Sequence, residues 1–114
     1  MPSDTPRRTW IEIDPAALQH NAGVARAASG GAAVMAVVKA DGYGHGLAGV
    51  TSALRDEVEA FGVATLDEAL EVRRIAGDDR PVMVLGALLP DEREAAVRAR
   101  LSVTVSDVDE ALAY

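Results

Sequence analysis

The sequence predicts an α/β fold built on a parallel sheet. Short apolar runs alternate along the chain with segments of helical periodicity, which is the pattern of repeated strand–helix units. Hydrophobic residues make up 49% of the chain but aromatic residues only 4%, so any core is built mainly from aliphatic side chains. Such a core is typical of sheets whose strands are covered by helices.

Four apolar runs are expected as strands, and each is followed by a helical pattern. The expected strands are residues 34–38, 61–64, 81–85 and 101–105.

Capping residues mark the helix boundaries. Asp14 precedes Pro15, which predicts the start of a helix before the first strand. Thr65 and Glu68 have the spacing of a capping box, and Gly77 closes the helix that they begin.

Further helices are predicted from Leu47 and over roughly residues 91–100, and the glycine-rich segment 39–46 is expected as a loop. Ser106 with Asp109 predicts the cap of one more helix, which the chain enters before Tyr114.

Four strand–helix units are half the number in a (β/α)8 barrel, a fold of about 250 residues. A complete flavodoxin-like sheet is the alternative, but a natural domain seldom ends inside a newly capped helix. We therefore expect residues 9–114 to form the N-terminal half of a truncated TIM-type barrel domain, after a flexible arm at residues 1–8. Residues 9–13 alternate like a strand and are expected to pair outside this segment. Half a barrel leaves apolar strand edges unpaired, so the isolated chain should self-associate.

Composition excludes several classes of function. The chain has no cysteine, which removes disulfides and thiolate metal sites and favours a cytoplasmic location. Its net charge is −7 with dispersed arginines, so we expect no nucleic-acid partner. No apolar run approaches the ~20 residues that span a bilayer, so no membrane association is expected. The two histidines, His20 and His45, lack metal-ligand spacing, and no metal site is expected.

Lys39 is the sole lysine and follows the most apolar run of the chain. Ligands bind at the carboxyl ends of parallel strands, which is where Lys39 is expected. Strand alternation gives Val37 and Lys39 the same direction, and an inward ammonium group is disfavoured by desolvation. A neutral amine is the form that condenses with an aldehyde cofactor as a Schiff base. The alternative is a lysine that extends to solvent, although the other ten basic positions are all arginine.

Residues 40–46, Ala-Asp-Gly-Tyr-Gly-His-Gly, allow two interpretations. Residues 44–49 match the G-x-G-x-x-G dinucleotide pattern, but five residues separate the strand from its first glycine. Read instead as a phosphate-side loop, the glycines allow close approach and the Tyr43 hydroxyl can donate to a phosphate oxygen, unless its ring merely packs beside the helix. His45 is expected to hold the turn through backbone hydrogen bonds, and Asp41 to fix it by an Asx-type turn.

Residues 36–46, Ala-Val-Val-Lys-Ala-Asp-Gly-Tyr-Gly-His-Gly, resemble the pyridoxal 5′-phosphate attachment motif of alanine racemases. The flanking segments 10–14 and 61–65 resemble the same family, and the likeness covers essentially the whole chain. Related barrel decarboxylases and pyridoxal phosphate homeostasis proteins also place a lysine at the end of the first strand, but they lack the continuation 41–46.

The resemblance implies a pyridoxal 5′-phosphate enzyme that interconverts L-alanine and D-alanine for peptidoglycan precursors and acts as a cytoplasmic homodimer. Lys39 would hold the cofactor as a Schiff base and then move the substrate α-proton on one face. Tyr43 would bind the cofactor phosphate, and Val37 and Leu85 would line its ring.

The resemblance also implies groups that this chain does not supply. The opposite-face tyrosine from a second subunit, the arginine against the pyridine nitrogen, the carboxylate-binding groups and a C-terminal β-domain that pairs with residues 9–13 all match regions beyond Tyr114. We therefore expect this segment to be inactive alone. A non-catalytic pyridoxal phosphate carrier is the alternative function.

Overall fold

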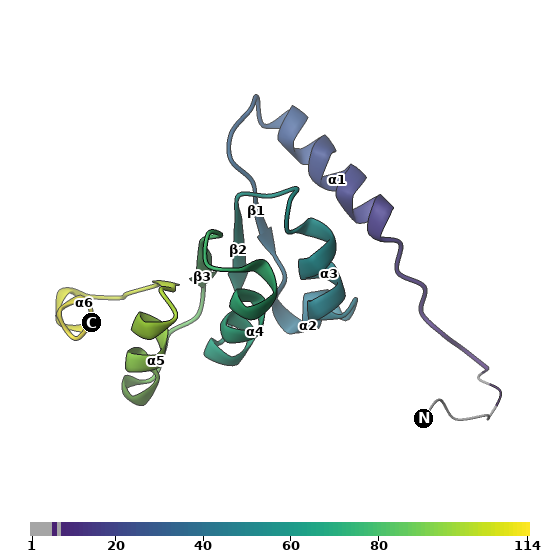
Figure 1. Cartoon of the computed structure of the whole chain (residues 1–114). Coiled ribbons are helices and arrows are strands. Elements are labelled where there is room, and N and C mark those ends of the chain that lie inside the picture. Colours follow the sequence, from purple (N-terminus) through teal and green to yellow (C-terminus); the bar gives the residue numbers. More distant parts are fainter. Residues whose placement is uncertain (1–5, 7) are drawn as a thin grey trace.

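The computed structural model describes residue 6 and residues 8–114, so most of the predicted N-terminal arm lies outside the described residues. Within that range one parallel sheet holds four strands in the order β1-β2-β3-β4 (Figure 1). The strands are β1 (Met35–Val37), β2 (Ala60–Val63), β3 (Val82–Val84) and β4 (Ser102–Val103).

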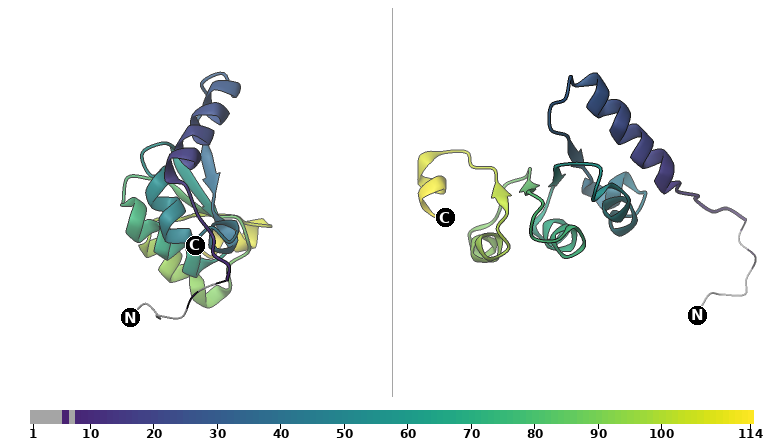
Figure 2. Two further views of the ribbon diagram at one scale, coloured as in Figure 1. Left: turned by 90° about the vertical axis from the view of Figure 1, so that its right-hand side faces the viewer. Right: turned by 45° about the horizontal axis from the view of Figure 1, so that its top comes forward.

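Helices precede and follow the strands in the predicted alternation. They are α1 (Pro15–Ala28), α2 (Lys39–Tyr43), α3 (Leu47–Leu54), α4 (Leu66–Ala76), the 3-10 helix η1 (Pro90–Glu92), α5 (Arg93–Arg98) and α6 (Val108–Leu112). The right-hand view of Figure 2 shows α3, α4 and α5 along one side of the row of strands. Consecutive parallel strands with helices on one side form the first four units of a (β/α)8 barrel, which confirms the predicted fold class.

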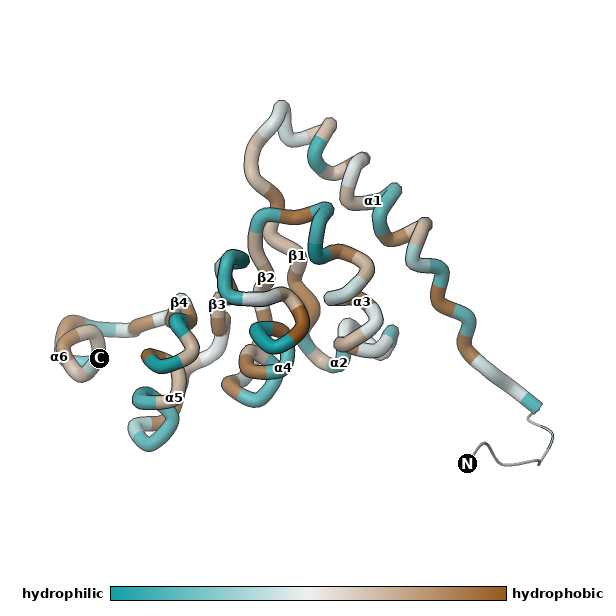
Figure 3. The backbone as a smooth tube through the Cα atoms, viewed as in Figure 1, coloured by the Kyte–Doolittle hydropathy of each residue, from teal (hydrophilic) through white to brown (hydrophobic). Residues whose placement is uncertain are grey.

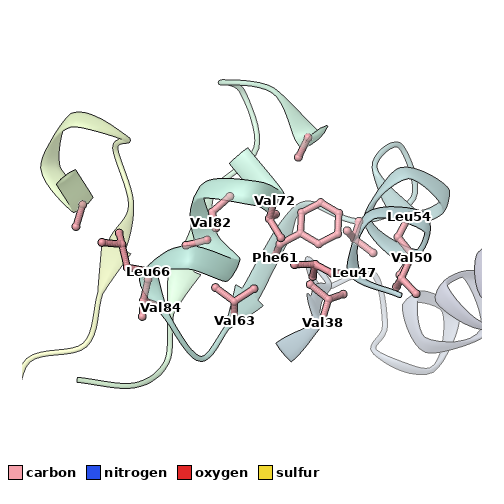
Figure 4. Packing of buried hydrophobic residues seen from close by; sticks show 14 of the residues in the cluster. Val38, Leu47, Val50, Leu54, Phe61, Val63, Leu66, Val72, Val82 and Val84 are labelled. Carbon is pink, nitrogen blue, oxygen red and sulfur yellow. The ribbon is translucent and has the colours of Figure 1, made fainter. Parts of the chain in front are cut away.

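The core lies between the sheet and these helices. Phe61, Val63, Val82 and Val84 are fully buried there, and Figure 4 shows Phe61 between the β3 side chains and those of α3. Burying a side chain of the size of Phe61 contributes about 2–3 kcal/mol to folding. The core therefore holds the helices against one face of the sheet.

The opposite face of the sheet is apolar but uncovered. Met35, Val37 and Leu85 are each about 40% exposed (41%, 38% and 38%). Figure 3 shows β1 as a hydrophobic segment, in contrast to α1, along which the hydropathy alternates. In a closed barrel this face would point to the interior. Its side chains are therefore available to line a site at the carboxyl ends of the strands.

The predicted caps of two helices are confirmed. The Asp14 side chain accepts hydrogen bonds from Ala16 N and Ala17 N at the start of α1. Thr65 and Glu68 form the capping box of α4, and Gly77 is its C-cap.

Other boundaries differ from the prediction. The strands are shorter, and the fourth helix begins with the 3-10 turn η1. The cap of α6 is Asp107, which accepts from Glu110 N, so the prediction of Ser106 was wrong by one residue. Residues 9–13 form no strand here. In the described part of the chain, none of the helices combines the length and apolar character needed to cross a membrane.

Candidate functional site

Lys39 lies at the carboxyl end of β1, where the sequence placed it. Extended geometry ends one residue earlier than expected, because Val38 has a ψ of 21° and Lys39 is already the first residue of α2. Val38 is buried in the core, and its N–H donates to the carbonyl oxygen of Gly62 on β2 at 2.9 Å. Lys39 itself is half-buried.

The segment after Lys39, which was expected as a loop, is a left-handed helical turn. Ala40, Asp41, Gly42 and Tyr43 have φ values of 52°, 55°, 62° and 56°. A left-handed conformation costs a residue with a Cβ roughly 1–2 kcal/mol, and three of these four residues carry one. Strained backbone of this kind persists only where surrounding contacts hold it.

Asp41 and His45 hold the far end of this turn. The Asp41 carboxylate accepts from Leu47 N at 2.8 Å. The backbone carbonyl oxygen of Asp41 accepts from Gly46 N, also at 2.8 Å. The predicted Asx-type turn at Asp41 was wrong, because the left-handed backbone carries its carboxylate to the start of α3 instead. His45 Nδ1 lies 3.0 Å from the Gly42 carbonyl oxygen, to which it donates when protonated, so its predicted backbone-holding role is confirmed.

Glu68 holds the near end of the turn, and sequence reasoning found only half of its role. One carboxylate oxygen accepts from Ala64 N at 3.0 Å and Thr65 N at 3.1 Å, as the capping box requires. The other oxygen accepts from Ala40 N at 2.7 Å. No periodicity links residues 28 apart, so only the packing of α4 against β2 and β3, next to the end of β1, reveals this second contact.

Val37 and Leu85, the two residues predicted to line a cofactor ring, lie on the uncovered face on either side of Gly62. A Cβ placed on Gly62 would lie 3.5 Å from Val37 Cγ2, 3.4 Å from Leu85 Cδ1 and 3.1 Å from Met35 Sδ. These three side chains therefore converge over Gly62, leave little room for a Cβ there, and form one continuous apolar surface. Sequence reasoning did not single out Gly62, although a glycine inside a strand indicates close approach of a ligand or backbone.

Tyr43 is 59% exposed at the end of the left-handed turn. Together with Val37 and His45 it lines an apolar groove of about 340 Å³ between α1, α3 and the free edge of β1. Two other hollows, of about 400 and 410 Å³, lie near the C-terminal end of the chain and contain none of the predicted site residues.

The arrangement brings an amine, an exposed phenol and an exposed apolar surface to one end of the sheet. Lys39 and Tyr43 frame the left-handed turn, and Val37 is two residues before Lys39. The exposed apolar side chains of Val37 and Leu85 suit the face of a flat ring, and an amine such as that of Lys39 can act as a nucleophile toward a carbonyl group. Among the described residues no group of His, Asp and Glu side chains is arranged to hold a metal ion.

Comparison with known proteins places these features in a family. The family model described as the alanine racemase N-terminal domain matches residues 13–114. An alanine racemase of Streptococcus pyogenes serotype M5 is 41% identical over 104 residues, which is 90% of this chain and 28% of that relative.

Solved structures agree with this result. The biosynthetic alanine racemase of Pseudomonas aeruginosa superposes with a TM-score of 0.81 at 33% identity, over 89% of this chain and 28% of that one. A histidine racemase from Leuconostoc mesenteroides superposes with a TM-score of 0.78 at 30% identity, over 87% and 27%. The chain thus spans little more than a quarter of the length of the relatives it matches.

Proposed function

This chain belongs to the alanine racemase N-terminal domain family, and on that premise we propose that it forms part of an enzyme that interconverts L-alanine and D-alanine. The observation that carries the proposal is the motif 36–46, in which Lys39 lies just after β1 and a strained left-handed turn follows it. We propose pyridoxal 5′-phosphate as the cofactor and a cytoplasmic role in supplying D-alanine for peptidoglycan precursors.

The residues present fit this cofactor. Val37 and Leu85 are each 38% exposed and offer apolar contacts to its ring, and the absence of a side chain at Gly62 lets them lie close together. The exposed hydroxyl of Tyr43 is a donor for a phosphate oxygen, and the amine of Lys39 suits the aldehyde group. When bound, the cofactor withdraws electrons from the substrate Cα and so makes its proton acidic.

Lys39 has two roles in this proposal. Its Nζ holds the cofactor before substrate binds, and after release the same amine takes or returns the proton at the substrate Cα on one face. Val37 and Leu85 keep water from the ring face that they cover, and Tyr43 orients the phosphate end. The family resemblance supplies the rest: a tyrosine from a second subunit serves the opposite face, so the active form is a homodimer.

The half-barrel described here contains one of these two proton-transfer groups. We therefore propose that residues 1–114 attach the cofactor but do not racemise alanine without the rest of the barrel and a partner subunit. The chain spans 28% of the length of these relatives, which supports the proposal that the remaining groups come from outside residues 1–114.

Reduction with borohydride tests the attachment in the 114-residue chain. With pyridoxal 5′-phosphate present, peptide mapping should place the reduced adduct on Lys39, which is the sole lysine. Lys39→Arg is the matched control, because arginine keeps the positive charge and, since it stays protonated, is not a nucleophile. Labelling confined to the α-amine of Met1 would refute the assignment.

Proton exchange tests the activity. A protein that contains this chain and the complete barrel should exchange the α-proton of alanine with solvent and invert its stereocentre. Cofactor attachment without exchange of any amino acid would instead establish the non-catalytic carrier. Histidine is the second substrate to offer, because the Leuconostoc relative is named as a histidine racemase; faster exchange of histidine would overturn alanine as the substrate.

A further inference from the structure

The left-handed turn after Lys39 is held at its two ends by different parts of the molecule. Its far end is tied locally, through Asp41 and His45, to the start of α3. Its near end, at Ala40, is tied to α4 through the Glu68 carboxylate at 2.7 Å. Among the described hydrogen bonds this is the side-chain contact that reaches the turn from another strand–helix unit.

The two neighbours of Lys39 are both held by the second strand–helix unit. Val38 N donates to Gly62 O on β2, and Ala40 N donates to Glu68 on α4. Lys39 therefore has one hydrogen bond on each side of it in the chain, and these two bonds restrict the position of its Cα. The second of them acts on a residue with a φ of 52°, which relaxes to negative φ unless it is held.

The contact requires a carboxylate rather than any polar group. Glu68 accepts from three backbone N–H groups, two through Oε1 and one through Oε2. A carboxylate has acceptor sites on both oxygens, whereas a glutamine has one oxygen and one NH₂ group. Gln at position 68 would therefore satisfy either the capping box or Ala40, and would point an N–H group at the other donor.

We propose that Glu68 is a positioning residue for Lys39: through the Ala40 amide it holds the start of the left-handed turn and so fixes where the Lys39 amine emerges from β1. The inference rests on the proposed function of Lys39 as the cofactor-attachment residue. Glu68 itself touches neither cofactor nor substrate in this assignment.

Two measurements on the 114-residue chain test it. Hydrogen–deuterium exchange read by residue-level mass spectrometry follows the Ala40 amide without cofactor. Borohydride trapping at increasing times then gives the rate at which pyridoxal 5′-phosphate attaches to Lys39. Glu68→Gln should speed exchange at Ala40 and slow attachment, each by about tenfold, as expected for the loss of a hydrogen bond to a charged group.

Two control variants separate positioning from general effects. Thr65→Ala removes the other half of the capping box and weakens α4, but it leaves the contact between Glu68 and Ala40. Glu71→Gln removes the same charge from an exposed position of α4. Both should leave exchange at Ala40 and attachment at Lys39 within about threefold of the original chain, since neither touches the turn.

The outcomes are distinct. Unchanged Ala40 exchange in Glu68→Gln, or faster exchange with an unchanged attachment rate, would overturn the positioning role. So would slowing of attachment by Thr65→Ala to the same extent as by Glu68→Gln. Absence of a Lys39 adduct in the unmodified chain would instead overturn the proposed function, whatever the Ala40 amide does.

Discussion

The two ends of the sheet are held by opposite chemistry. At the carboxyl ends of the strands, carboxylates accept from backbone N–H groups: Glu68 from Ala40, Ala64 and Thr65, and Asp41 from Leu47. At the amino ends, guanidinium groups donate to backbone carbonyls, and Arg73 alone contacts the carbonyl oxygens of Gly77, Arg80, Ala99 and Arg100. Arg26 and Arg80 make similar contacts with Glu57 and Arg55.

Helix polarity explains this division. Every helix that follows a strand begins near the carboxyl end of the sheet, where its first N–H groups have no partner within the helix. It ends near the amino end, where its last carbonyl groups are unpaired. Acidic side chains therefore serve one end and arginines the other, in agreement with the helix dipole. Glu59 is an exception, since it accepts from Val34 N at the amino end.

We expect side chains at the amino ends of the strands to affect mainly the stability of the fold, and side chains at the carboxyl ends to affect mainly cofactor attachment. The arginine end closes turns that connect helices to strands and that include a single left-handed non-glycine residue, Arg100. The carboxylate end holds a left-handed turn with three non-glycine residues beside Lys39. Substitutions at the two ends should therefore change different properties, and the following predictions test that separation.

The largest effect is expected from Arg73→Ala at the arginine end. The substitution leaves carbonyl groups of two turns without their shared donor, so the free energy of unfolding should fall by about 3 kcal/mol. Urea unfolding measures the change, with the exposed neighbour Arg74→Ala as the control. Cofactor attachment to Lys39 in the folded protein should persist. A selective loss of attachment without loss of stability would break the separation.

The next effect is expected at the carboxylate end. Gly42 has a φ of 62°, and a Cβ there would lie 3.2 Å from Val50 Cγ2, so Gly42→Ala adds a close contact to backbone strain. We expect a loss of about 2 kcal/mol in urea unfolding together with weaker cofactor attachment. Gly44→Ala is the control, because its φ is 83° but no atom lies within 4 Å of its Cβ position. Equal losses in the two variants would show that the contact with Val50 is unimportant.

Gly62→Ala should affect function with little effect on stability. Its Cβ meets only side-chain atoms, and replacing a strand glycine by alanine stabilises a protein by at most about 1 kcal/mol. The same Cβ would press on Met35, Val37 and Leu85 and displace the side chains proposed to line the ring. The cofactor concentration needed for half-maximal attachment should therefore rise about tenfold, equivalent to about 1.4 kcal/mol. Gly49→Ala on α3 should leave that concentration unchanged. An unaltered cofactor requirement in Gly62→Ala would show that the packing of Val37 and Leu85 over Gly62 does not matter for attachment.

The smallest effect is a pH dependence at the arginine end. The pKa of Glu59 is lowered, first by its hydrogen bond with Arg26 and then by the Val34 N–H group. A carboxylate with a lowered pKa stabilises the fold above its ordinary pKa of about 4.3 and loses that contribution as the pH falls through the folded-state pKa. Unfolding of Glu59→Gln should therefore depend less on pH below about 4.3 than that of the original chain. Parallel pH curves would show that the pair contributes nothing.

Much of the fold follows from local patterns. Asp14 before Pro15, and Thr65 with Glu68, mark helix starts because a side-chain acceptor three or fewer residues away satisfies the first N–H groups. The motif 36–46 identifies the family, and with it the position of Lys39, because it is a contiguous string. The boundaries at Ser106 and at the fourth helix were less accurate, since several neighbouring residues can cap a helix equally well.

The sequence by itself determined the order of strands and helices, the parallel sheet and the residue proposed to attach the cofactor, because each depends on residues close together in the chain. Only the tertiary structure decided that residues 40–43 wind to the left, that Val37 and Leu85 converge over Gly62, and that Glu68 reaches Ala40. These features depend on contacts between units that lie far apart in sequence, and such contacts exist only once the sheet has brought neighbouring strands together.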